Sequence, residues 1–206
     1  MPVLNFRARR AAIATALSAA MLLTATACAT EDSRQNAVAV GGTFTFVSPG
    51  GETVVKYAPE ERKPVAEFSG EDLMEPNKTI NLSDFKDQVV VLNAWGQWCA
   101  PCRSESDDLQ RVQETMQERD LGTLLGINVR DTHRQKPQDF VTDNGLTYPS
   151  IYDPPFKTAA RLGGIPASVI PTTIVLDKQH RPAVVFLQEV TDKQLLEAVE
   201  EVAAEG

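Results

Sequence analysis

The chain has 206 residues, a formal net charge of −8 and a hydrophobic fraction of 42%. This length suits one domain of ordinary size, and so acidic a composition disfavours nucleic acid as a partner and anionic lipid as a charge-attracted surface. Because only three cysteines and two histidines are present, a closed zinc site has few candidate ligands.

The first 27 residues have the pattern of an export signal. Three arginines (Arg7, Arg9 and Arg10) precede residues 11–27, which carry no charge and are rich in alanine, leucine and threonine. That stretch is too modestly hydrophobic for a permanent membrane span. It ends in Ala-Thr-Ala-Cys at residues 25–28, which resembles the lipobox of bacterial lipoproteins and implies a diacylated Cys28, although the same small residues suit ordinary cleavage.

Export and lipidation together predict a location on the extracytoplasmic face of the cell membrane. Loss of the leader arginines takes the net charge to about −11, so a diacyl anchor is the expected membrane contact. Outside the cytoplasm disulfides persist, and a reactive cysteine pair can exchange with secreted proteins.

The predicted organisation has four parts. Residues 1–27 are a signal peptide, residues 28–41 a flexible tether, residues 42–63 an accessory β-hairpin with a linker, and residues 64–206 the main domain. The hairpin strands are expected at residues 43–47 and 52–57, around a Ser-Pro-Gly-Gly turn.

A cysteine pair follows the most apolar stretch of the main domain. Residues 89–94 read Val-Val-Val-Leu-Asn-Ala and predict a buried strand, and residues 102–119 predict a helix. Cys99 and Cys102 lie between them, at a helix N-terminus where unpaired N–H groups and the helix dipole lower a cysteine pKa. We therefore expect Cys99, the outer cysteine, to attack a disulfide and Cys102 to resolve the mixed disulfide.

Two other interpretations of the pair are weaker. A purely structural disulfide with a two-residue spacer adds little stability by loop closure. A zinc site would need two further ligands, and Cys28, His133 and His180 form no second paired motif.

Residues 90–105, Val-Val-Leu-Asn-Ala-Trp-Gly-Gln-Trp-Cys-Ala-Pro-Cys-Arg-Ser-Glu, resemble the active-site block of membrane-tethered thioredoxin-like proteins of the TlpA/ResA type. The resemblance covers about residues 64–203 and includes Ile170-Pro171-Thr172. It implies an α/β thioredoxin fold, a mixed central sheet flanked by helices, with the TlpA/ResA-type insertion at residues 137–155.

The remaining elements alternate in the order that this fold requires. Strands are expected at residues 78–82, 123–129, 150–152, 172–176 and 183–187. Helices are expected at residues 83–85 (a single turn), 156–162 and 192–202, and residues 140–144 are expected to end a helix at Gly145. Strand–helix–strand crossovers followed by a hairpin and a helix predict a mixed sheet with helices on both faces.

The resemblance also implies roles for residues around the cysteines. Pro171 matches a cis-proline beside the pair, whose preceding residue, Ile170, offers its backbone to an incoming peptide. Trp98 is the expected exposed neighbour of Cys99, and Trp95 then belongs to the core.

Glu105 lies one helical turn beyond Cys102, where a carboxylate can accept or return the Cys102 proton. The TlpA/ResA type similarly has a glutamate at the matching place. The alternative is a carboxylate favoured by the helix dipole alone. Asn93, where cytoplasmic thioredoxin has an aspartate, agrees with the TlpA/ResA branch.

The loop after residues 123–129 should lie at the same sheet edge as the cysteines. Arg130, Asp131 and His133 are therefore candidates to border the site, although a solvated loop is the favoured alternative.

These observations predict an extracytoplasmic thiol-disulfide oxidoreductase without a cofactor or a bound metal. By resemblance, its client is apocytochrome c, which must be reduced before haem attachment, and its electrons come from a CcdA-type membrane thiol relay. The alternatives are an oxidant for secreted-protein folding and a copper metallochaperone using both cysteines and a histidine. A thiol peroxidase is disfavoured because residues 93–98 lack the expected threonine.

Overall fold

The structure is a computed structural model, and it describes residues 44–46 and 50–205. The predicted signal peptide, the tether and Cys28 lie outside the described residues. Within them, no helix has the length and apolar character needed to cross a membrane.

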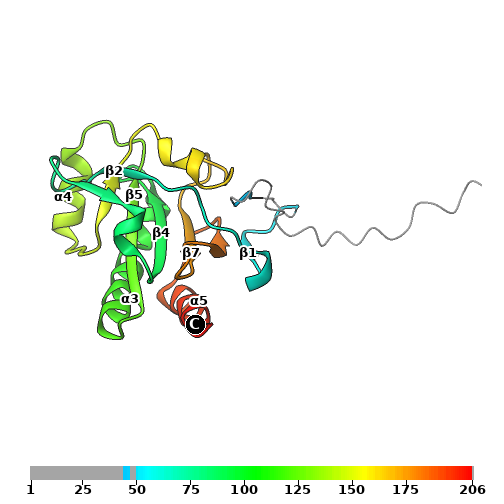
Figure 1. The fold of residues 1–206 in the computed structure, drawn as a ribbon. Coiled ribbons are helices and arrows are strands. Elements are labelled where there is room, and N and C mark those ends of the chain that lie inside the picture. The colour runs from blue at the N-terminus through cyan, green and yellow to red at the C-terminus, as the bar shows by residue number, and fades with distance from the viewer. Residues whose placement is uncertain (1–43, 47–49, 206) are drawn as a thin grey trace, which may run out of the picture. The chain divides into compact units, whose positions relative to one another are not determined.

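A six-stranded mixed sheet forms the centre of the described chain, in the order β1-β8-β7-β4-β5-β6 (Figure 1). The strands are β1 (Val54–Lys56), β4 (Val89–Trp95), β5 (Gly122–Asn128), β6 (Ser150–Tyr152), β7 (Thr172–Leu176) and β8 (Pro182–Phe186). Strands β4, β5 and β6 are parallel, whereas β7, β8 and β1 join by antiparallel pairing. This confirms the predicted mixed sheet.

The central strands are buried on both faces, which explains their continuous apolar sequences. Every residue of β4 and of β5 is buried. Alternate residues enter different apolar clusters, with Val91 and Trp95 on one face of the sheet and Val90 and Leu92 on the other. Because β4 and β5 are parallel, their C-terminal ends lie at the same edge of the sheet. The cysteine pair follows β4 at this edge.

The α-helices pack mainly on one of these faces. They are α2 (Ala100–Ser104), α3 (Ser106–Glu118), α4 (Gln135–Asp143) and α5 (Asp192–Ala203). Apolar residues of α3, α4 and α5 share a cluster with Val91, and α3 and α5 lie side by side (Figure 1). The other face is covered by extended segments and by the 3-10 helices η2 (Leu82–Phe85) and η3 (Lys157–Arg161). A further 3-10 helix is η1 (Pro59–Glu61).

The predicted helix at residues 102–119 is interrupted. Helix α2 ends at Ser104 and α3 starts at Ser106, with Glu105 as the junction. The Glu105 carboxylate turns into the protein and is fully buried, and the sequence periodicity of a helix does not reveal such a junction.

The accessory hairpin differs from its prediction. Its second strand exists as β1, but β1 pairs with β8 at the edge of the main sheet. Phe44 and Phe46 form no strand; both are buried in the core, and their N–H groups donate to Pro64 O and Gly163 O. Residues 43 and 47–49 of the predicted hairpin lie outside the described residues.

A two-stranded antiparallel sheet, β2 (Ser69–Glu71) and β3 (Thr79–Asn81), lies before β4. Strand β3 falls within a predicted strand, but β2 was not predicted. Its sequence, Ser-Gly-Glu, has no apolar residue and gives no strand pattern.

Candidate active site

Cys99 and Cys102 form a disulfide at the predicted place, between the end of β4 and the first turn of α2. Their Cα atoms are 5.3 Å apart. Cys99 is the N-cap of α2, and its sulfur accepts a hydrogen bond from the Cys102 N–H at 3.3 Å. A backbone N–H at a helix N-terminus is the type of donor that stabilises a cysteine thiolate.

The disulfide is less exposed than the sequence suggested. Each cysteine has only 3% of its surface accessible, whereas Trp98 beside it is 43% exposed. Trp95 is buried, so the two tryptophans divide as expected. Trp98 is fixed by its indole N–H, which donates to Val129 O at 2.9 Å.

A cis-proline segment lies against Cys99. The Ile170–Pro171 peptide bond is cis, as the resemblance implies, and Ile170 O lies 3.8 Å from Cys99 Sγ. Ile170 is partly buried and Pro171 precedes β7, the antiparallel neighbour of β4. The cis-proline segment therefore places the Ile170 carbonyl beside the reactive sulfur. Pro171 itself has no backbone N–H to donate.

Glu105 is buried completely and its carboxylate accepts two hydrogen bonds. Asn93 Nδ2 donates to Oε1, and the Val190 N–H donates to Oε2, both at 3.0 Å. Burial raises the pKa of Glu105 to about 7, and these two hydrogen bonds partly oppose that rise. Glu105 is therefore not a solvated helix-start carboxylate, and it can gain or lose a proton near neutral pH.

Asn93 connects Glu105 to the neighbouring strand. Its Nδ2 also donates to Thr173 Oγ1 at 3.0 Å, so the amide joins β4, β7 and the start of α3. The comparison with thioredoxin had singled out Asn93, but it could not identify Thr173 or Val190 as partners of this network.

The loop after β5 is hydrogen-bonded to the cysteine loop through Asp131. Asp131 is buried, and its Oδ2 accepts from the Gln97 N–H at 2.7 Å and from Asn128 Nδ2 at 2.8 Å. Tyr152 OH donates to Asp131 O. Asp131 thus borders the site as a structural support, a role that the sequence did not distinguish from a solvated loop.

His133 is exposed, and its Nδ1 lies 3.2 Å from Thr132 Oγ1. Among residues 44–46 and 50–205, no group of three or more His, Cys, Asp or Glu side chains is arranged to hold a metal ion.

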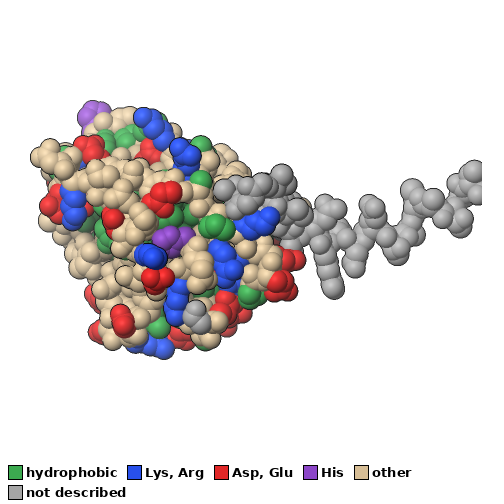
Figure 2. All heavy atoms as spheres, viewed as in Figure 1, with side chains coloured by type: hydrophobic (Ala, Val, Ile, Leu, Met, Phe, Trp, Pro, Cys, Tyr) green, Lys and Arg blue, Asp and Glu red, His purple; other side chains and the backbone are tan. Residues whose placement is uncertain are grey.

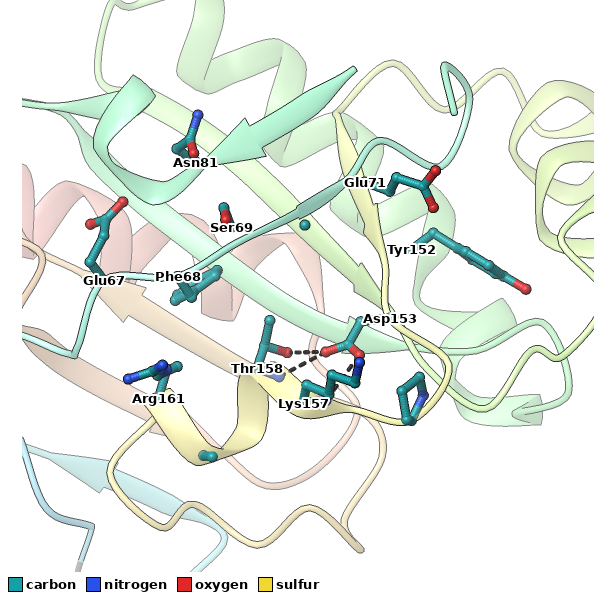
Figure 3. A pocket seen from close by; sticks show the side chains of 13 residues that line it. Glu67, Phe68, Ser69, Glu71, Asn81, Tyr152, Asp153, Lys157, Thr158 and Arg161 are labelled. Atoms are coloured by element: carbon teal, nitrogen blue, oxygen red, sulfur yellow. Dashed lines mark hydrogen bonds between the residues drawn. The ribbon is translucent and has the colours of Figure 1, made fainter. Parts of the chain in front are cut away.

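A cavity of about 740 Å³ lies elsewhere, between β2 and the segment that follows β6 (Figure 3). Asp153 lines it and accepts hydrogen bonds from the N–H groups of Lys157 and Thr158 and from the Thr158 hydroxyl. None of its lining residues belongs to the predicted redox site.

The comparisons with known proteins agree with this geometry. A model described as the AhpC/TSA family matches residues 62–181, more than half of the chain. A thiol:disulfide interchange protein DsbE from Allochromatium vinosum is 34% identical over 119 residues, covering 57% of this chain and 61% of the relative. A thiol-disulfide oxidoreductase ResA from Bacillus thuringiensis subsp. konkukian is 29% identical over 124 residues, covering 60% of this chain and 66% of the relative. The matches therefore span slightly less than two thirds of these relatives.

A solved structure is similar over a larger share. The secreted thiol-disulfide isomerase from Corynebacterium glutamicum has 63% sequence identity and a TM-score of 0.77. The comparison covers 80% of this chain and 99% of the other. This similarity extends to the fold and to most of the sequence that the two chains share.

Proposed function

The chain belongs to the AhpC/TSA family, and we propose that it is a thioredoxin-like thiol-disulfide oxidoreductase acting on exported proteins. The observation that carries this proposal is the Cys99–Cys102 disulfide at a helix start, with Ile170 O of the cis-proline segment 3.8 Å from Cys99 Sγ. The DsbE and ResA names of its relatives support the same activity.

The proposed exchange uses two sulfur-transfer steps. In the reduced protein, the Cys99 thiolate attacks one sulfur of a client disulfide, forming a mixed disulfide and expelling the other client sulfur as a thiolate. The Cys102 thiolate then attacks Cys99 Sγ, so that the protein gains its disulfide and the client leaves as a dithiol. Two electrons pass from protein to client, and both client thiolates take up protons.

Glu105 supplies a proton acceptor for this sequence. Its carboxyl has a pKa of about 7 and lies one turn beyond Cys102, so its ionised form can take the Cys102 proton as that thiol becomes the attacking thiolate. Trp98 and Ile170 form the walls between which we place the client peptide, with Pro171 holding the Ile170 carbonyl beside the sulfur.

The proposed client is apocytochrome c, and the proposed electron donor is a CcdA-type membrane thiol relay. Both follow from the resemblance of residues 90–105 to the TlpA/ResA type. The proposed location is the extracytoplasmic face of the membrane, with a lipid anchor on Cys28. The leader sequence supports export, and the relative from Corynebacterium glutamicum is described as secreted.

In a second candidate function, the same cysteines form or rearrange the disulfides of secreted proteins. The name of the 63% identical relative, a thiol-disulfide isomerase, favours it. The reduction potential separates the two: a value near −270 mV, about that of thioredoxin, indicates a reductant, and a value near −120 mV, about that of DsbA, indicates an oxidant.

Trapping the mixed disulfide tests the activity and identifies the client. In cells producing the exported full chain with Cys102→Ser, the client should stay covalently attached to Cys99, because the resolving thiol is absent. The Cys99→Ser, Cys102→Ser double variant is the control. We expect apocytochrome c among thiol-released, Cys99-dependent partners identified by mass spectrometry. A trap empty of exported cysteine proteins contradicts the proposed activity, and cytochrome c with normal covalent haem in a deletion strain contradicts the proposed client.

A further inference from the structure

Three arginines in the described part of the chain make no ion pair with a carboxylate, and two of these three lie at the cysteine loop. The five arginines with carboxylate partners are Arg62, Arg111, Arg119, Arg134 and Arg181. The three without such a partner are Arg103, Arg130 and Arg161. On a chain of net charge −8, cations left without acidic partners beside the reactive disulfide need an explanation.

Arg130 bridges the two walls of the site. Its guanidinium carbon lies 5.4 Å from the centroid of the Trp98 ring, and its Nη2 donates to Ala167 O at 2.6 Å. Trp98 precedes Cys99, and Ala167 begins the segment that leads to Ile170. The guanidinium is therefore stacked on one wall and hydrogen-bonded to the other.

The backbone of Arg130 is held in an uncommon conformation. Its φ is +60°, in the left-handed region, and its N–H donates to Pro154 O at 2.9 Å. A non-glycine residue adopts this region at a conformational cost and persists there when the surroundings fix it. The loop thus directs the Arg130 side chain toward Trp98.

Arg103 adds a second cation to the cysteine loop. It extends from α2, is exposed, and its Nη1 donates to Gln97 O at 2.8 Å. Both arginines are fixed by carbonyl oxygens, and Arg130 also by an aromatic ring. Because a carbonyl does not neutralise a guanidinium, each keeps its full charge and further N–H donors for a ligand.

The carboxylate of Asp131, the residue after Arg130, does not neutralise the positive charge of the two arginines at the surface. Asp131 is only 6% exposed, and its Oδ2 is already bonded to the Gln97 N–H and to Asn128 Nδ2. On the face drawn in Figure 2, acidic and basic side chains are interspersed. The rim formed by Trp98, Arg103 and Arg130 therefore presents an aromatic ring and two cations that have no carboxylate partner among the described residues.

We propose that Arg130 is a client-binding residue that pairs with an acidic side chain next to the target cysteine of the client, and that Arg103 strengthens the same preference. This inference rests on the proposed function and specifies its substrate class. Complementary rim charges act chiefly on encounter rates and on the choice of partner, so the effect should appear as discrimination between clients.

Two synthetic peptides test the inference. Each carries an intramolecular disulfide, and they differ only in Glu or Gln beside the first cysteine; bis(2-hydroxyethyl) disulfide is an uncharged third probe. The reduced full chain is mixed with each disulfide, and its oxidation is followed in single turnovers by tryptophan fluorescence. We expect the wild type to react about three- to tenfold faster with the Glu peptide at low ionic strength. Arg130→Gln should remove that preference, so that the ratio of the rates with the Glu and Gln peptides falls to about one.

Arg161→Gln is the matched control. Arg161 is exposed, lacks a carboxylate partner, and lines the cavity of Figure 3, so this change removes the same charge away from the cysteine loop. The Glu preference should survive it. Thermal unfolding checks that both variants are folded.

The possible results distinguish the proposed client preference from the proposed exchange activity. Equal wild-type rates with the Glu and Gln peptides overturn the inference and leave the exchange activity standing. Equal slowing of all three probes by Arg130→Gln also overturns it, because Arg130 would then act on the Cys99 thiolate. If the reduced wild type oxidises with none of the probes, the proposed function itself fails.

Discussion

At the scale of single residues, Glu105 is a carboxyl group enclosed in the protein interior. It is fully buried, and its pKa is raised to about 7, with desolvation as the largest cause. A carboxyl whose pKa is higher in the folded than in the unfolded state stabilises the fold at low pH. That contribution is lost as the pH rises from the unfolded pKa, about 4.5, through about 7.

Replacing Glu105 by glutamine should therefore make stability less dependent on pH. Glutamine resembles the protonated carboxyl, so Glu105→Gln and wild type should be similar near pH 5. At pH 8 the wild type carries a buried charge and should lose up to about 3 kcal/mol relative to the variant. Urea unfolding of the oxidised proteins at both pH values measures the difference.

Glu118→Gln is the control for this prediction, because Glu118 is exposed at the end of α3. It should follow the wild-type pH dependence. A Glu105→Gln variant that loses as much stability between pH 5 and pH 8 as the wild type would show that Glu105 does not titrate in this range.

The residue-scale features divide into those with a local pattern and those without one. The cysteine pair, the cis-proline and the division between Trp95 and Trp98 follow from short motifs and their family resemblance. The partners of Glu105 do not, because Asn93 and Val190 lie 12 and 85 positions away. Asp131 and Arg130 acquire their contacts only when the loop after β5 folds against residues 97–98.

At the scale of elements, a glycine lets three parallel strands pack on the face that carries Glu105. Gly126 of β5 is paired in register with Asn93 of β4 and Ser150 of β6. A Cβ at residue 126 would lie 2.2 Å from Ser150 Oγ and 2.9 Å from Trp95 Nε1. Both distances are too short for non-bonded atoms, so a side chain at this position forces its neighbours to shift.

Gly126→Ala should accordingly destabilise the protein by about 1–3 kcal/mol, the range for overpacking a core. Ser150→Ala removes the nearer of the two clashing atoms, so Gly126→Ala should cost less in that background. A double-mutant cycle measured by urea unfolding gives the coupling. Strict additivity of the two changes would contradict the crowding between these residues.

The elements themselves could be predicted where the apolar pattern is strong. Strands β4, β5, β6 and β7 and helix α5 lie within two residues of their expected bounds. The pattern failed at three places: β1 pairs with β8, β2 is a polar three-residue strand, and the helix after Cys102 is divided at Glu105. In none of these three cases does the local sequence have a hydrophobic periodicity that indicates the observed structure.

At the scale of the whole molecule, the fold collects one site from distant segments. The end of β4 supplies the cysteine loop, the loop after β5 supports it, and the segment before β7 lies across Cys99. The family resemblance predicted this gathering, because it follows from the order of parallel and antiparallel strands. The basic rim on an acidic chain was not predicted, since composition gives the total charge and not its distribution.

The central claim is that Cys99 is an activated nucleophile, and the pH dependence of its alkylation tests that claim most directly. The reduced exported protein with Cys102→Ser keeps the backbone N–H that faces Cys99 Sγ. Its reaction with iodoacetamide is followed from pH 3 to pH 10 by mass spectrometry of the Cys99 peptide. We predict a midpoint clearly below about 8.5, the value of free cysteine. A midpoint at or above that value, or a sulfur that stays unmodified throughout, would contradict the account.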